Sequence, residues 1–143
     1  RNPDMATIHD YLTAIYLEDG DLPEFVAANR AYGELRHLPE EVAFAERLEA
    51  ALARDPAAVL PIVQARLDAD IASGARWSLP WPVFVATAAG DRAAAVRLID
   101  LGLSRGEKWN RAGLLRYVRQ QWRDDAEIIG KLDELSSPSI AGN

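Results

Sequence analysis

The dipeptide Gly20-Asp21 recurs as Gly90-Asp91, and the tripeptide Arg54-Asp55-Pro56 lies almost midway between the two. Successive aspartates are separated by 34 and then by 36 residues. Each one follows a stretch of helically spaced apolar residues and precedes another, so each marks a turn between two helices. A period of about 34 residues is typical of arrays in which helical hairpins stack in series. The spacing therefore predicts a helical repeat architecture.

No strand-like alternation interrupts the helical pattern. We predict an all-α fold, an α-α superhelix of antiparallel helix pairs over residues 5–37, 39–73 and 80–104, with a closing pair over 109–135. These pairs form one domain over residues 1–135, and the tail 136–143 is expected to be flexible. Proline inside a helix removes a backbone hydrogen bond, so we expect a kink at Pro61.

Small, large and aromatic residues stand in a recurring order around the Gly-Asp turns. They are Ala6, Leu12 and Tyr16 before Gly20-Asp21, and Ala95, Ile99 and Leu103 after Gly90-Asp91. This order resembles that of the tetratricopeptide repeat, and the resemblance covers most of the chain. The second unit matches mainly by spacing, because Arg54 stands where glycine is usual. Residues 114–125 are similar to the closing helices of repeat regions in bacterial regulators. The resemblance implies a docking module in the C-terminal part of a larger bacterial sensor or regulator.

In tetratricopeptide repeats the ligand groove is lined mainly by the first helix of each pair. Carried over to this chain, the resemblance implies a groove lined by Asp10, Leu17, Phe44, Leu48, Trp77 and Phe84. Chaperone-binding members grip a terminal carboxylate with lysine and asparagine, but Asp10 and Ala14 occupy those positions here. We therefore expect an apolar or aromatic groove that accepts a helix or an extended peptide of another protein.

Arginines are concentrated near the end of the chain. The cluster comprises Arg111, Arg116, Arg119 and Arg123, and the last three share one helix face by their spacing. Such a face is suited to an anionic partner: a phosphate, an acidic peptide or the acidic flank of a second copy. The alternative is that these arginines pair with the neighbouring acids, which are Asp124, Asp125 and Glu127.

Composition narrows the classes of function. A net charge of −6 argues against nucleic acid as the main partner, because phosphate binding needs a basic excess. No apolar stretch approaches the ~20 residues that span a bilayer. The chain has no cysteine, and His9 and His37 have no second ligand at helical spacing, so we expect no metal site. No phosphate loop or nucleophile motif is present, and we expect neither a cofactor nor an enzymatic activity.

The sequence thus predicts a non-enzymatic module that binds a protein or peptide, with a cytoplasmic location and the periplasm left open. Homo-oligomerisation is one alternative, because residues 18–70 carry 12 acids against 5 bases and residues 105–123 carry 6 bases against 1 acid. A small-molecule sensor is the other, with the ligand near Trp77, Trp81 and the arginine cluster. The competing interpretation of Trp81, Trp109 and Trp122 is that they fill the core.

Overall fold

The computed structural model describes residues 15–16, 19–74, 80–109 and 115–136, and every regular element in these ranges is helical. The elements are α2 (Leu22–Leu35), α3 (Pro39–Arg54), the 3₁₀ helix η1 (Pro56–Ala58), α4 (Val59–Ser73), α5 (Pro80–Ala88), α6 (Arg92–Ser104), α7 (Arg116–Gln121) and α8 (Ala126–Ser136). The predicted all-α class is confirmed for this part of the chain. Residues 15, 16 and 19 are helical, but most of the predicted first helix lies outside the described residues.

The two Gly-Asp turns have the same geometry. Gly20 and Gly90 have φ values of +79° and +71°, in the left-handed region that glycine adopts without steric cost. The amide of Asp21 donates to the Tyr16 carbonyl and that of Asp91 to the Ala86 carbonyl, both at 3.0 Å. Each aspartate then caps the next helix, because its carboxylate accepts from the amide three residues later, at 3.1 Å for Asp21 and 3.0 Å for Asp91.

The turn at Asp55 differs from these two. Asp55 accepts from the Ala57 amide at 2.9 Å, as expected of a cap, but its backbone is extended and no glycine precedes it. The chain continues through η1 before α4 begins at Val59. Pro61 therefore falls in the first turn of α4 rather than in the interior of a longer helix. The amide that proline lacks has no intrahelical partner at that position, so Pro61 removes no hydrogen bond from α4.

Helix α2 ends two residues earlier than the sequence predicted. His37 has φ +56°, and the amide of Leu38 donates to the Gly33 carbonyl at 2.8 Å. This hydrogen bond satisfies one of the last carbonyl groups of α2 and so closes the end of the helix. The residue with positive φ in such a motif is usually glycine, but here it is His37. It turns the chain directly into α3, which begins at Pro39 as predicted.

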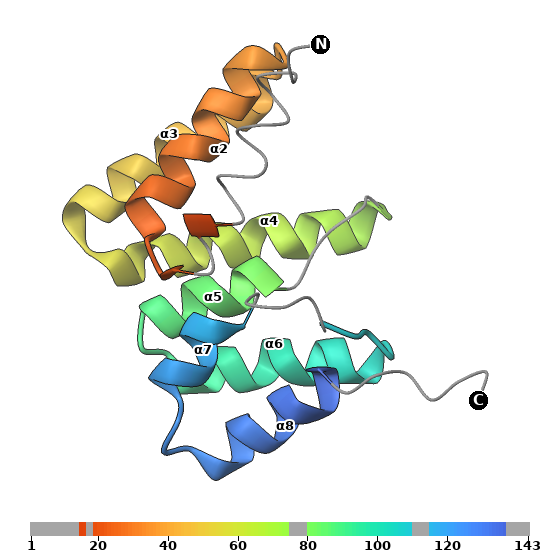
Figure 1. The fold of residues 1–143 in the computed structure, drawn as a ribbon. Helices are drawn as coiled ribbons and strands as arrows, with labels where there is room; N and C mark the ends of the chain where they lie inside the picture. Colours follow the sequence, from red (N-terminus) through yellow and green to blue (C-terminus); the bar gives the residue numbers. More distant parts are fainter. Residues whose placement is uncertain (1–14, 17–18, 75–79, 110–114, 137–143) are drawn as a thin grey trace, which may run out of the picture.

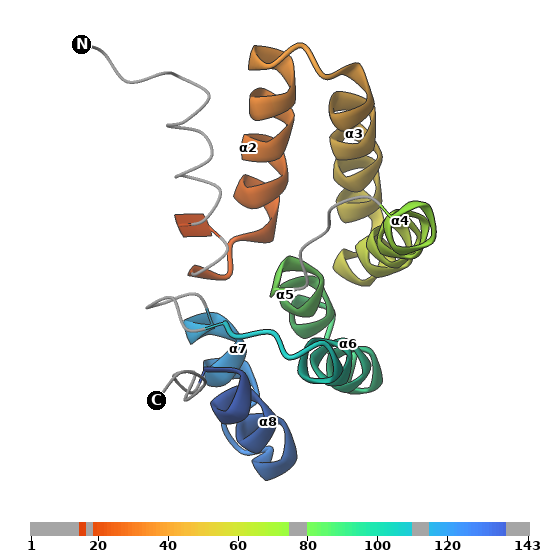
Figure 2. The same ribbon diagram turned by 90° about the vertical axis from the view of Figure 1, so that its right-hand side faces the viewer.

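The helices are paired differently along the chain. Helices α2 and α3 run side by side as an antiparallel hairpin, and α4 packs at a steep angle to α3 instead of lying along it (Figures 1 and 2). The antiparallel pair predicted over 39–73 is therefore wrong in its orientation. Helices α5 and α6 do form a hairpin, α7 packs on α5, and α8 packs on α6. Of the predicted closing pair, only Arg116–Gln121 and Ala126–Ser136 are described as helix; α8 includes Ser136, and the tail 137–143 lies outside the described residues.

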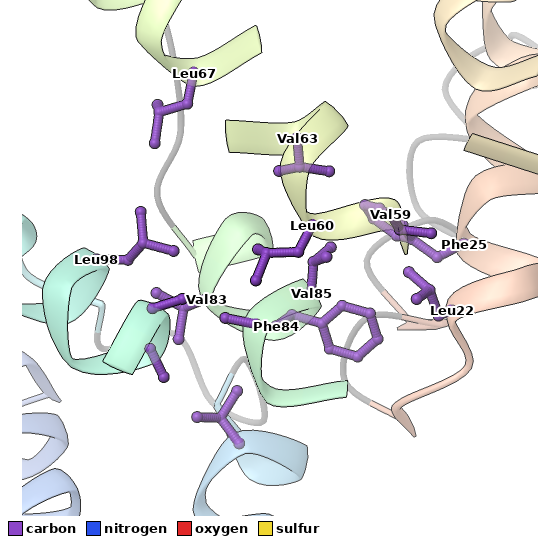
Figure 3. Packing of buried hydrophobic residues seen from close by; sticks show 14 of the residues in the cluster. Leu22, Phe25, Val59, Leu60, Val63, Leu67, Val83, Phe84, Val85 and Leu98 are labelled. Carbon is purple, nitrogen blue, oxygen red and sulfur yellow. The ribbon is translucent and has the colours of Figure 1, made fainter. Parts of the chain in front are cut away.

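Helix α5 lies at the centre of a single hydrophobic core. Its residues from Val83 to Ala86 are at most 1% exposed, so two opposite faces of the helix are covered. Figure 3 shows Phe84 directed toward Leu22 and Phe25 of α2, while Val83 lies on the side of Leu98 of α6. Burial of such side chains contributes about 1.5–3 kcal/mol each, so the mainly apolar α5 contributes several kcal/mol to folding.

Several contacts join residues of the first predicted pair, 5–37, to the pairs after residue 80 without passing through the second predicted pair, 39–73. The Phe25 ring of α2 lies 5.9 Å, between centroids, from the Phe84 ring of α5. Asp19 accepts a hydrogen bond from Arg116 at 2.6 Å across 97 residues of sequence. In an open solenoid each unit touches only its neighbours. The helices of this chain are therefore packed more compactly than those of an open solenoid.

Candidate functional site

Three of the residues predicted to line a ligand groove are core residues. Leu48 is 2% exposed, Phe84 is 1% exposed and Phe44 is 8% exposed. Their assignment to an open groove is wrong, because all three side chains are buried in the hydrophobic core. Arg66 of α4 and Trp81 of α5 pack on the Phe44 ring, and Phe84 faces Phe25 of α2 (Figure 3). The other predicted groove residues, Asp10, Leu17 and Trp77, lie outside the described residues.

Two arginines cover the outer side of Phe44. The guanidinium carbon of Arg66 lies 4.7 Å from the ring centroid and that of Arg47 lies 5.5 Å from it. Arg66 also donates to Glu41 at 2.6 Å and faces Asp70 at 3.5 Å. These acids, Glu41 first, raise the pKa of Arg66. The cluster joins α3 to α4 by cation–π contacts and ion pairs around the buried Phe44 ring.

The predicted anionic-partner patch is partly neutralised within the chain. Arg116 pairs with Asp19, and Arg119 donates to Asp133 at 2.6 Å and to the Ser136 hydroxyl at 3.0 Å. Arg123 is exposed, and Arg111 lies outside the described residues. Arg116 and Arg119 are thus paired with acids of the same chain, as the alternative interpretation held, but their partners are not the predicted ones.

The neighbouring acids bind a different arginine. Arg92, at the start of α6, donates to Asp125 at 2.6 Å and 3.2 Å and to Glu127 at 2.6 Å. Asp125 also caps α8 by accepting from the Ile128 amide at 3.2 Å. The hydrogen bond from Arg92 lowers the pKa of Asp125, and the backbone amide of Ile128 lowers it further. This cluster holds the first turn of α6 to the first turn of α8.

An aromatic row runs through the middle of the molecule. The Trp81 ring lies 5.4 Å from Phe25 and 6.4 Å from Phe44, and the row continues from Phe25 through Phe84 to Tyr117, 5.2 Å beyond. Burial raises the pKa of the Tyr117 hydroxyl. The row links α3, α5, α2 and α7, so the main role of these aromatic side chains is to pack the helices together.

The remaining described tryptophans also belong to the core. Trp109 is 5% exposed and its indole donates to Glu107 at 3.0 Å. Trp122 donates to the buried hydroxyl of Thr87 at 2.9 Å, and Thr87 in turn donates to the Val83 carbonyl at 2.8 Å. The interpretation of these tryptophans as core residues is confirmed, and Thr87 is a buried polar partner that the sequence pattern did not indicate.

Exposed apolar residues flank the turn between α2 and α3. Leu35 is 43% exposed and Leu38 is 40% exposed. Leu35 stands at helical spacing with the buried Phe25 and Ala28, but α2 ends at this residue and the chain turns at His37, where φ is +56°. The sequence signal for this exposure is Leu38-Pro39, because a proline four residues after Leu35 indicates that the helix ends nearby. We call Leu35 and Leu38 the hairpin tip.

The described residues contain no group of three or more histidine, cysteine, aspartate or glutamate side chains placed to hold a metal ion. Within the same ranges, none of the helices combines the length and the apolar character needed to cross a bilayer. His37 is exposed in its turn, and His9 lies outside these ranges. Family models, curated protein sequences and solved structures yield no match to this chain.

Proposed function

We propose that this chain is a non-enzymatic helical-repeat module, a compact and degenerate α-α superhelix similar to tetratricopeptide repeats, that binds a segment of another protein. The observation that carries the proposal is the matched geometry of two turns 70 residues apart. Gly20-Asp21 and Gly90-Asp91 share the left-handed glycine, the same backbone hydrogen bond and the same carboxylate cap. Matching turns support a common origin of the hairpins that they join, and helical hairpins of this kind serve mainly as docking surfaces.

The stacking of the last two pairs adds support. Helix α7 packs on α5 and α8 packs on α6, so the first helices of the two pairs touch each other and so do the second helices. This is the relationship expected of successive hairpins in a repeat array. The contacts of Phe25 with Phe84 and of Asp19 with Arg116 make the array compact. A compact array offers an outer surface and its turns to a partner in place of a long inner groove.

The hairpin tip is the surface that we propose for the partner. Leu35 and Leu38 are large apolar side chains with about two fifths of their surface exposed, and charged residues, Glu34, Arg36 and Glu40, surround them in the sequence. An apolar centre within a charged rim is the usual composition of a protein-binding patch. We assign it to an apolar segment of another protein, since Arg116 and Arg119 already pair within the chain and offer little charge to a second copy.

Selection of displayed peptides tests this proposal. A random peptide library is selected against the immobilised full chain, and the enriched sequences are measured by fluorescence anisotropy. We expect an apolar consensus whose affinity falls at least tenfold in Leu35→Glu/Leu38→Glu. The matched control is Ala65→Glu/Ala69→Glu on the exposed side of α4, which adds the same charge elsewhere and should leave the affinity unchanged.

Circular dichroism and the melting temperature establish that both double variants are folded before their affinities are compared. Failure to enrich any sequence would overturn the proposal of a peptide-binding module. Enriched peptides that bind both variants as tightly as the original chain would overturn the hairpin tip as their site. Concentration-dependent sedimentation of the chain, without any selected peptide, would favour homo-oligomerisation instead.

A further inference from the structure

We draw no further inference here: the strongest candidate, the contact of Arg116 and Tyr117 on α7 with the turn at Asp19 and Gly20, is a packing contact of the fold already described, and nothing in the structure shows what would open it or take its place.

Discussion

The Tyr117 ring lies against Gly20 so closely that a Cβ atom on residue 20 would stand 2.3 Å from its Cδ1 atom. This contact joins the first turn of the chain to α7, nearly one hundred residues later. It requires glycine at position 20 for two independent reasons: the positive φ of +79° and the absence of space for a side chain. Gly90 shares only the first of these reasons, since no atom of the described residues lies within 4 Å of the corresponding position.

Substituting each of these two glycines by alanine distinguishes the cost of backbone strain from the cost of a steric clash. Gly90→Ala should lower the free energy of unfolding by about 1–2 kcal/mol, the cost of a left-handed residue that is not glycine. Gly20→Ala should cost about 1–3 kcal/mol more, because the Tyr117 ring must move. Urea unfolding followed by tryptophan fluorescence measures both. Equal losses in the two variants would show that α7 does not rest on the Gly20 turn.

Leu48 and Leu35 distinguish a core position from a surface position on the same hairpin. Leu48→Ala should lower the free energy of unfolding by about 2–5 kcal/mol, since it leaves a cavity in the hydrophobic core. Leu35→Ala should change it by no more than about 0.5 kcal/mol, because the side chain is 43% exposed. Chemical denaturation compares the two. A small loss for Leu48→Ala would restore this residue to an open groove and contradict the packing described.

Local chemistry explains which parts of the fold the sequence predicted well. The caps at Asp21, Asp55 and Asp91 depend on the carboxylate and on amides two or three residues away, and the left-handed turns depend on a single glycine. Such signals are complete within a few residues of sequence. They indicate where helices begin, while the helical spacing of the apolar residues between them predicts the all-α class.

The candidate site was harder to predict because it depends on which helix covers which face. Phe44 and Leu48 are apolar residues at helical spacing, and this spacing is the same for a groove and for a core. Only the tertiary packing decides between them, as it does for Phe44, on which Arg66 of α4 and Trp81 of α5 pack. Likewise, Arg116 has acids close in sequence but pairs with Asp19, whose position relative to α7 is set by the tertiary fold.

The hydrogen bond between Trp122 and Thr87 fastens the end of α7 to α5. In a double-mutant cycle of Trp122→Phe and Thr87→Val, the double variant should lose less stability than the sum of the two single variants. The difference should be about 0.5–1.5 kcal/mol, the usual contribution of one such hydrogen bond. Valine keeps the shape of threonine, and the separate costs of each substitution, such as the smaller ring of phenylalanine and the lost bond to the Val83 carbonyl, cancel in the cycle. Thermal or urea unfolding of the four proteins measures the coupling. Simple additivity would mean that the indole and the hydroxyl do not interact in solution.

The cluster of Arg92 and Asp125 should make stability dependent on pH. Because the folded state lowers the pKa of Asp125, the unfolded chain takes up its proton first as the pH falls. The contribution of the pair is therefore complete above about pH 5, begins to fall near the unfolded value of about 3.9, and is lost once the pH drops below the folded pKa. An asparagine at this position would still cap α8, so Asp125→Asn removes the charge alone.

Asp125→Asn should therefore unfold more readily than the original chain at pH 7, and the difference should shrink as the pH is lowered through about 4 toward about 2. Arg92→Gln should reduce the same pH-dependent part, because the hydrogen bond from Arg92 is the largest cause of the lowered pKa. Urea unfolding at a series of pH values measures both differences. A difference between Asp125→Asn and the original chain that stays constant across this whole range of pH would mean that Arg92 does not hold the Asp125 carboxylate.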